Sequence, residues 1–332
     1  MNGVLIIDKP AGLTSHDVVN RARRILGERS IGHLGTLDPM ATGVLPLVTG
    51  NLTRLAQFYV ASEKVYEGTI RFGFSTDTYD AEGEPTSEQE AVALQQDQLD
   101  SLAAKFRGVI EQTPPPFSAK KIKGVPAYKL ARKQKEVVLQ PVQVEIKEFE
   151  ILTVEAEYAQ FRARVASGTY MRSVAHDLGR QLGCGAHLAS LRRTAVAEFT
   201  LDDAHTLEII EGAIPSSHKM SDEAKNCHPD RSFRLPQGEG SGVEGPCVSA
   251  ELETLFVHPR KLLPQLPCVT ADEPTAALIR NGRTVNLPDF SRARQVKVFT
   301  GQRDLIAIAT RIAGTLFHPK IVLAPDSPRV PR

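Results

Sequence analysis

The sequence predicts an α+β protein with a second, small β-rich unit at its C-terminal end. Three observations lead to this class. Up to residue 210, segments with the period-2 pattern of strands occur together with segments that have the 3.6-residue period of amphipathic helices. From about residue 214 to 250, Ser, Gly, Glu and Pro dominate and no period survives. Short apolar strands and one helix then follow.

The bulk composition bounds the class of protein. The chain has 332 residues, which is long for one compact domain and indicates two. Its apolar fraction of 41% and charged fraction of 24% are those of an ordinary globular protein. No apolar run is long enough to span a membrane. The opening MNGVLIIDKP indicates a first strand rather than a secretory signal.

The charge and the cysteines indicate little about partners but something about location. A net charge of +1 neither requires nor excludes a nucleic-acid partner, because local basic surface can exist within a neutral total. The four cysteines show no pairing pattern, and no export signal is present. We therefore expect reduced thiols in a cytoplasmic protein.

The first fifty residues contain a strand, a helix and a loop-rich segment. Residues 4–7 form a short apolar strand. Thr14 and Asp17 have the spacing of a capping box, which starts an amphipathic helix that ends near Gly27. Residues 31–50 contain four glycines and two prolines, a composition typical of tight turns, and loops carry chemistry more often than cores do.

The remaining elements alternate between strand-like and helix-like patterns. Strands are expected at 64–74, 187–193, 296–299 and 305–309, with two more within 142–165. Helices are expected at 88–106, 128–133, 170–182 and 274–280. The patternless stretch between residues 213 and 252 is interpreted as a flexible insert.

One segment stands out chemically: residues 32–45, Gly-His-Leu-Gly-Thr-Leu-Asp-Pro-Met-Ala-Thr-Gly-Val-Leu. Taken alone, Asp38-Pro39 is typical of a helix start, because Asp is a good N-cap and Pro is favoured at the first helical position. His33 alone would usually be a structural histidine. The whole string, however, resembles the catalytic motif of pseudouridine synthases, in the branch of the bacterial T-loop enzymes (TruB type) and their box H/ACA relatives.

Other segments resemble further motifs of this family, in the same order along residues 3–210. They are the strand and Lys-Pro turn at 3–10, Lys64-Val65-Tyr66 with residues 73–78, the RNA-gripping insertion at 115–121, residues 167–173, and Leu191-Arg192-Arg193. The resemblance implies a catalytic domain on a mixed, mainly antiparallel sheet over residues 1–212, with a thumb-like insertion at about 114–140. A small PUA-like RNA-binding domain at 253–332 would follow the insert at 213–252.

The resemblance also implies the reaction, which explains the residue types. Pseudouridine formation breaks the N1–C1′ bond of uridine and joins C5 to C1′, without a change of oxidation state, so we expect no cofactor and no metal. A carboxylate, Asp38, would add to the base, attack C1′ or remove a ribose proton, and the sequence does not choose among these roles. Burial would raise the pKa of Asp38, and Arg172, by resemblance its ion-pair partner, would lower it.

The target uridine must leave its stack before a catalytic group can reach it. Tyr66 is expected as the aromatic platform and, by resemblance, as the residue that handles the C5 proton. Leu191 would form an apolar wall, Tyr170 would support the pocket, and His33 would fill or prop the gap left in the RNA. Lys9, from the Lys-Pro turn, is expected to bind substrate.

A basic cluster follows the Pro-rich stretch that starts at Pro114. It includes Lys120 and Lys121, with Phe117 and Tyr128 nearby. A solvated surface is the ordinary interpretation of such a run. The resemblance to the thumb-like insertion favours phosphate contacts that position the RNA.

These expectations combine into one predicted function, to which there are several alternatives. The chain would convert uridine to pseudouridine at position 55 in the T loop of tRNA, acting as a monomer without guide RNA or protein partner. A guide-dependent H/ACA-type synthase is the nearest alternative. A non-catalytic tRNA-binding or tRNA-folding protein could keep the same surfaces. A carboxylate hydrolase would need a second acid or a metal cluster, and neither is evident in the sequence.

Overall fold

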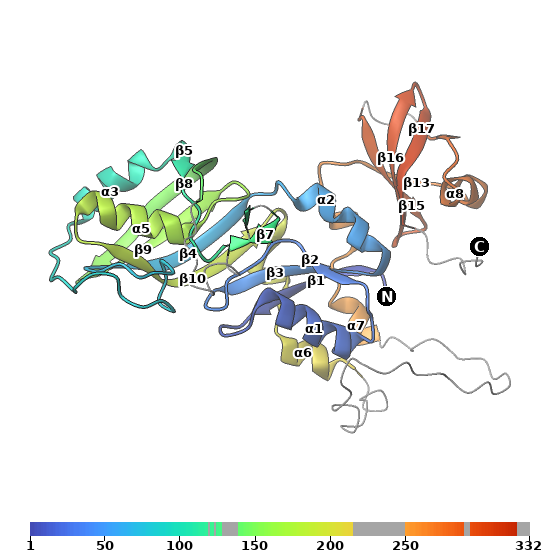
Figure 1. Ribbon diagram of the computed structural model, residues 1–332. Coiled ribbons are helices and arrows are strands. Elements are labelled where there is room, and N and C mark those ends of the chain that lie inside the picture. The colour runs from blue at the N-terminus through green and yellow to red at the C-terminus, as the bar shows by residue number, and fades with distance from the viewer. Residues whose placement is uncertain (119, 123, 128–138, 215–249, 289–292, 324–332) are drawn as a thin grey trace.

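Two sheets organise the computed structural model, which describes residues 1–118, 120–122, 124–127, 139–214, 250–288 and 293–323 (Figure 1). The larger sheet has ten strands, eight of them in the order β12-β1-β3-β10-β4-β9-β8-β5, with β2 beside β3 and β11 beside β10. Its strands are β1 (Gly3–Lys9), β2 (Ile31–His33), β3 (Thr42–Thr49), β4 (Lys64–Phe72), β5 (Gly108–Gln112), β8 (Val142–Glu155), β9 (Tyr158–Val165), β10 (Ala186–Val196), β11 (Phe199–Thr200) and β12 (Ala204–His205).

The pairing confirms the predicted mixed, mainly antiparallel sheet. Among the described strands of the large sheet, only β1 with β12 and β10 with β3 pair in parallel. The other neighbours, such as β4 with β10 and β8 with β9, are antiparallel. A short hairpin of β6 (Lys121–Ile122) and β7 (Val125–Pro126) lies in the region of the expected thumb-like insertion.

Helices cover one face of the large sheet. They are α1 (Ser15–Leu26), α3 (Gln96–Lys105), α5 (Met171–Leu182), α6 (Leu207–Gly212) and α7 (Ala250–Thr254), and they share one hydrophobic core with the sheet. α1 has the predicted capping box of Thr14 and Asp17 and ends at Gly27 in the left-handed conformation. No helix in the described part of the chain is long and apolar enough to cross a membrane.

The small C-terminal unit contains the five-stranded sheet β13-β15-β16-β17-β14 and one longer helix. Its strands are β13 (Cys268–Thr270), β14 (Val285–Asn286), β15 (Gln295–Thr300), β16 (Asp304–Ala313) and β17 (Leu316–Val322), and its helix is α8 (Glu273–Arg280). The predicted β-rich unit with one helix is therefore confirmed. Asp272 caps α8 by accepting a hydrogen bond from the amide of Thr275.

This unit packs on the face of β1 and β3 opposite to the helices. Along β1, Leu5 and Ile7 enter the helix-covered core, whereas Val4 and Ile6 enter a second core with Leu262, Phe299 and Ile308. The segment η1 (Gly50–Leu55) with α2 (Ala56–Tyr59) lies between the two sheets (Figure 1). Burial on both faces explains why the first strand is apolar at consecutive positions. The remaining 3-10 turns are η2 (Leu201–Asp203) and η5 (Pro259–Lys261).

One local expectation was wrong, and another lies outside the described residues. The helix predicted at 88–106 begins only at Gln96, and the preceding residues form no helix but pack Val92 and Leu94 against the core. Asp38-Pro39 starts no helix. It begins a tight turn in which the amide of Ala41 donates to the carbonyl of Asp38. The helix predicted at 128–133 falls on residues that the structure does not describe.

Candidate active site

A cavity of about 270 Å³ lies between the loop that carries Asp38 and the strands β4, β9 and β10. The predicted residues Asp38, Tyr66, Tyr170, Arg172 and Leu191 all line it, although they come from four separate segments of the chain. A cleft with a few polar groups and mostly apolar walls is the usual form of a small-substrate site. The structure thus brings together five of the residues that the sequence selected.

Asp38 and Arg172 form the expected ion pair. Nη2 of Arg172 donates a hydrogen bond of 3.0 Å to Oδ1 of Asp38, and Nε lies 2.9 Å from Oδ2. The Asp38 side chain is 34% exposed, whereas that of Arg172 is only 5% exposed. The carboxylate therefore opens to the cavity, while the guanidinium behind it is closed off from solvent.

Arg172 is fixed by groups other than Asp38. Its Nη2 also donates to the carbonyl of Phe117 (3.0 Å), and its Nη1 donates to the carbonyl of Thr78 (3.2 Å). Nη1 also lies 3.4 Å from Oδ2 of Asp80, a carboxylate that is itself buried. A planar guanidinium held on several sides has a defined orientation. Asp38 is consequently presented to the cavity in one geometry.

The electrostatics of the pair balance two effects. Protein atoms surround the carboxyl, and this burial raises the pKa of Asp38 above its usual range. The positive charge of Arg172 opposes the rise in this pKa, while the nearby carboxylate of Asp80 adds to it. Burial likewise raises the pKa of Glu82, two residues beyond Asp80. The site therefore contains an aspartate whose ionisation depends on its arginine neighbour.

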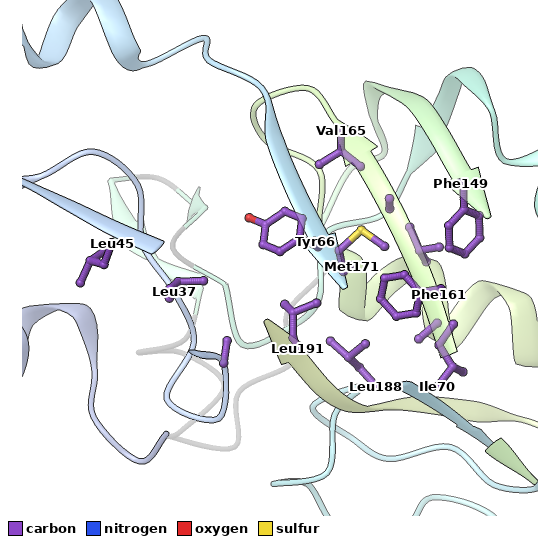
Figure 2. Packing of buried hydrophobic residues seen from close by; sticks show 14 of the residues in the cluster. Leu37, Leu45, Tyr66, Ile70, Phe149, Phe161, Val165, Met171, Leu188 and Leu191 are labelled. Carbon is purple, nitrogen blue, oxygen red and sulfur yellow. The ribbon is translucent and has the colours of Figure 1, made fainter. Parts of the chain in front are cut away.

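Tyr66 stands at the boundary between the apolar core and the cavity. Its side chain is 9% exposed and packs in the core shared with Met171 and Leu191. Figure 2 shows its hydroxyl directed away from Met171, toward the side on which Leu37 lies. The ring is thus an apolar wall with a polar tip, a form that suits stacking on a nucleobase.

Tyr170 and His33 occupy different positions. Tyr170 precedes α5, and its backbone is tied to Gln112, whose side chain accepts from the Tyr170 amide (2.8 Å) and donates to its carbonyl (3.1 Å). Burial raises the pKa of the Tyr170 hydroxyl. His33 lies at the end of β2 and is not among the residues that line the cavity. Burial, with Arg193 nearby, lowers the pKa of the His33 imidazole.

The geometry does not support the expectation that Lys9 contacts substrate. The side chain is fully buried, and Nζ donates to the carbonyls of Pro10 (2.8 Å), Leu13 (2.6 Å) and Pro39 (3.1 Å). Burial lowers the pKa of Lys9 to about 8. A buried ammonium with three carbonyl partners is a structural crosslink. Lys9 joins the end of β1 to the turn that starts at Asp38.

The basic residues of the thumb-like insertion are only partly described. Lys120 is exposed, and its carbonyl accepts from the amide of Ala127 (2.7 Å). The backbone of Lys121 belongs to β6. The remaining lysines and arginine of that cluster lie outside the described residues.

Three charged residues at the site were assigned no role from the sequence, although Lys64 and Arg193 stand in segments that resemble motifs of the family. Asp80 touches Arg172 from the side opposite to Asp38. Arg193 is 1% exposed and donates to the carbonyls of Gly35, Thr36 and Val44, so it clamps both ends of the Asp38 loop. Lys64 lines the cavity, and burial lowers its pKa to about 8. For Lys64 and Arg193 the available signal was a charged residue within a strand of mostly apolar residues, whereas Asp80 lies in a loop and carried no such signal.

Gly43 explains how Arg193 comes so close to the Asp38 loop. Gly43 has a φ of +97°, and a Cβ at this position would lie 2.2 Å from the carbonyl oxygen of Arg193. The two residues are partners in the parallel pairing of β3 and β10. Only glycine permits this approach of the two backbones.

Two family models match consecutive parts of the chain. The first, described as TruB family pseudouridylate synthase (N terminal domain), matches residues 23–171. The second, described as tRNA pseudouridylate synthase B C-terminal domain, matches residues 172–228. The boundary between the two matches falls between Met171 and Arg172.

Curated relatives carry the name tRNA pseudouridine synthase B. The protein of Solibacter usitatus is 47% identical over 97% of this chain and 100% of its own length. That of Aquifex aeolicus is 46% identical over 63% of this chain and 73% of its own length. Among solved structures, a Cbf5-Nop10-Gar1 complex contains a chain with 23% identity and a TM-score of 0.65, covering 97% of this chain and 85% of that one. This last likeness shows a shared fold.

Proposed function

Because the chain belongs to the TruB family of pseudouridylate synthases, we propose that it converts uridine to pseudouridine in the T loop of tRNA, at position 55. Asp38 is the catalytic carboxylate, Arg172 orients it, and Tyr66 is the platform for the flipped base. The observation that carries the proposal is the two-contact pair of Asp38 and Arg172 at the wall of a cavity that Tyr66 also lines.

The arrangement suits a reaction in which the uracil leaves C1′ and returns through C5. The bond from N1 to C1′ breaks, the bond from C5 to C1′ forms, C5 loses a proton and N1 gains one, so the atoms balance without a cofactor. An ionised carboxylate that faces the cavity can add to the base, attack C1′ or remove a ribose proton. All three roles require the charged form of Asp38, which Arg172 favours.

The base needs a closed apolar environment after it leaves the RNA stack. Tyr66, Leu191 and Met171 supply apolar surface along the cavity, and stacking on an aromatic ring returns about 1–3 kcal/mol per base. Tyr170 is the neighbouring support. His33 does not line the cavity. A position outside the cavity suits a residue that fills the gap left in the RNA by the flipped base.

Further assignments belong to the same proposal. The catalytic domain comprises residues 1–212, and residues 253–332 form a PUA-like domain that contacts RNA. Lys120 and Lys121 contact phosphates of the T arm. The enzyme acts in the cytoplasm without guide RNA. The absence of a protein partner and the monomeric state stay predictions.

Sequence identity to the relatives favours an enzyme that acts without a guide RNA over a guide-dependent one. Relatives that share 46–47% identity carry the name of a tRNA-modifying enzyme. The H/ACA-type chain with a similar fold shares only 23% identity. The higher sequence identity to the tRNA-modifying enzymes supports tRNA as the substrate.

The test uses the purified full chain and unmodified tRNA transcript, without any guide RNA. Pseudouridine is mapped by chemical labelling followed by primer extension. We expect one strong stop in the T loop with wild type and none with Asp38→Asn, while the variant still binds tRNA in a filter assay. Asp97→Asn, at an exposed aspartate on α3, is the matched control and should convert normally.

Two results would overturn the proposal. Conversion by Asp38→Asn at the wild-type rate would remove the assignment of the carboxylate. Conversion by wild type only after addition of a guide RNA would favour the H/ACA-type alternative.

A further inference from the structure

Tyr79 occupies an unfavourable backbone conformation beside the groups that hold Arg172. Its φ is +65°, and it is one of four non-glycine residues with positive φ in the described part of the chain. Bulky side chains rarely adopt this region, and such strain persists only where the surroundings enforce it. Tyr79 lies directly between Thr78 and Asp80, and both of these residues contact Nη1 of Arg172.

The Tyr79 side chain stacks on His176. The ring centroids are 3.8 Å apart, and the ring planes differ by 10°. His176 follows Arg172 by four residues on α5, so the two side chains project from the same face of the helix, one turn apart. α5 therefore holds the 78–80 segment at two successive turns, through Arg172 at Thr78 and Asp80 and through His176 at Tyr79.

The other side of this segment is fixed by the sheet. The carbonyl of Tyr79 accepts a hydrogen bond from the amide of Leu188 in β10 (3.0 Å). The carbonyl of Leu188 in turn accepts one from the amide of Ala81 (3.0 Å). The backbone at Tyr79 is thus held between β10 and α5. Loss of the stack would leave the contacts with β10 in place but remove one of the two contacts that hold the 78–80 segment on α5.

His176 acts in this stack through its ring. Its Nδ1 is buried and makes no hydrogen bond within the described part of the chain. Burial lowers the pKa of His176, with a further contribution from Arg180, which favours the neutral imidazole. A neutral ring without a partner at that nitrogen contributes contact area rather than a directed bond.

We propose that the Tyr79–His176 stack positions the Thr78 carbonyl and the Asp80 carboxylate against Arg172, and thereby orients Arg172 on Asp38. Tyr79 and His176 are positioning residues, and neither lines the cavity. The inference deepens the proposed function and depends on it. A purely structural role of the stack would affect the stability of the protein but not the rate of conversion by the folded enzyme.

The variants separate the ring from the backbone strain. Tyr79→Phe keeps the ring, Tyr79→Ala removes it and keeps the strain, and Tyr79→Gly removes both. His176→Ala removes the other half of the stack. His176→Phe keeps an aromatic ring in the stack, and it removes no hydrogen bond at Nδ1 because this atom has no hydrogen-bond partner in the described part of the chain. The matched control is Phe74→Ala, which disrupts another aromatic pair, that of Phe74 with His187 (centroids 4.6 Å apart), at a residue that does not touch Arg172.

The measurement is kcat and KM with unmodified tRNA, at a temperature well below the unfolding midpoint of every variant. We expect Tyr79→Ala, Tyr79→Gly and His176→Ala to lower kcat about tenfold or more, with KM changed less than about twofold, because misplacement acts on the chemical step. The double variant Tyr79→Ala/His176→Ala should lose no more than either single variant. Tyr79→Phe, His176→Phe and Phe74→Ala should keep wild-type kcat.

Four results would overturn the inference. They are wild-type kcat in folded Tyr79→Ala and His176→Ala, recovery of kcat in Tyr79→Gly, no recovery with the ring-retaining variants, and an equal fall of kcat in Phe74→Ala. Failure of the proposed function is recognised separately, because wild type would then not convert tRNA at all. If one alanine variant does not fold, the other alanine variant and Tyr79→Gly still remove half of the stack, and wild-type kcat in any of them that folds would overturn the inference.

Discussion

Arg172 contacts the Asp38 carboxylate at two atoms, although 134 residues separate them in the chain. The guanidinium is buried, whereas the carboxylate is open to the cavity. The buried guanidinium thus stabilises the negative charge of Asp38 from the side away from the cavity, and the carboxylate oxygens remain accessible from the cavity. The arrangement predicts how the pH dependence of the enzyme responds to changes on either side of the guanidinium.

Arg172→Met should move the acid limb of the pH–rate profile to higher pH. Burial raises the pKa of Asp38 and Arg172 opposes the rise, so removing the guanidinium raises this pKa further. If ionised Asp38 is required, activity is lost as pH falls through the raised pKa. Single-turnover rates measured across pH would reveal the shift. An acid limb that does not move would contradict the role of Arg172.

The same variant should also be less stable, in a pH-dependent way. Removing one member of a fully buried pair costs about 3–5 kcal/mol, and the loss should lie at or below the low end of this range because the Asp38 side chain is 34% exposed. A carboxyl with a raised pKa in the folded state contributes stability below its unfolded pKa and loses this contribution as pH rises through the folded pKa. The stability deficit of Arg172→Met relative to wild type should therefore shrink on acidification, as measured by urea unfolding.

Asp80→Asn should shift the acid limb in the opposite direction. The Asp80 carboxylate raises the pKa of Asp38, so its neutralisation lowers this pKa. The rate at the plateau should nevertheless fall about tenfold, because Arg172 loses a charged contact worth about 1.4 kcal/mol or more. The pH–rate profile checks both effects. If the acid limb moved to higher pH, as expected for Arg172→Met, the effect of Asp80 on the orientation of Arg172 would outweigh the effect of its charge on the pKa of Asp38.

Lys9→Met should destabilise the protein and slow the reaction. It leaves the carbonyls of Pro10, Leu13 and Pro39 without their buried donor. An unsatisfied buried polar group costs about 1–3 kcal/mol, so we expect a loss of about 3 kcal/mol or more in the free energy of unfolding. Lys9→Arg should not rescue stability, because the larger guanidinium would have to enter a site in which the side chain is already fully buried. Thermal unfolding and kcat would be measured together.

Gly43→Ala should cost far more stability than an ordinary substitution of a left-handed glycine. Its Cβ would meet the carbonyl oxygen of Arg193 at 2.2 Å. We expect a loss of about 3 kcal/mol or more, since neither backbone can move within the sheet. Gly27→Ala is the matched control. It has a φ of +61° but no atom within 4 Å of the new Cβ, so only about 1 kcal/mol should be lost. Equal losses in urea unfolding would refute the steric explanation.

Local signals in the sequence predicted most of the secondary structure. The capping box of Thr14 and Asp17 and the stop at Gly27 depend on residues within one helical turn. The strands β8 and β9 and the small C-terminal sheet follow from apolar periodicity. The prediction of a helix at 88–95 failed for a tertiary reason, because Val92 and Leu94 pack on the core outside any helix.

The site was predicted less evenly. Asp38, Tyr66 and Arg172 were selected by resemblance, and the structure places them around one cavity. Lys9 was expected to bind substrate but is buried, and Asp80 was not among the residues selected from the sequence. Its contact with Arg172 depends on how the 78–80 segment is held between α5 and β10.

The elements and the reactive groups can be inferred from local sequence, because helix caps, strand periods and residue chemistry are properties of neighbouring positions. The folded chain is needed to establish which charges meet, which lysine is buried, and that the small C-terminal unit packs on the face of β1 formed by Val4 and Ile6. These contacts join segments far apart in the chain. Their formation depends on the packing of the whole core, for which no local pattern carries a signal.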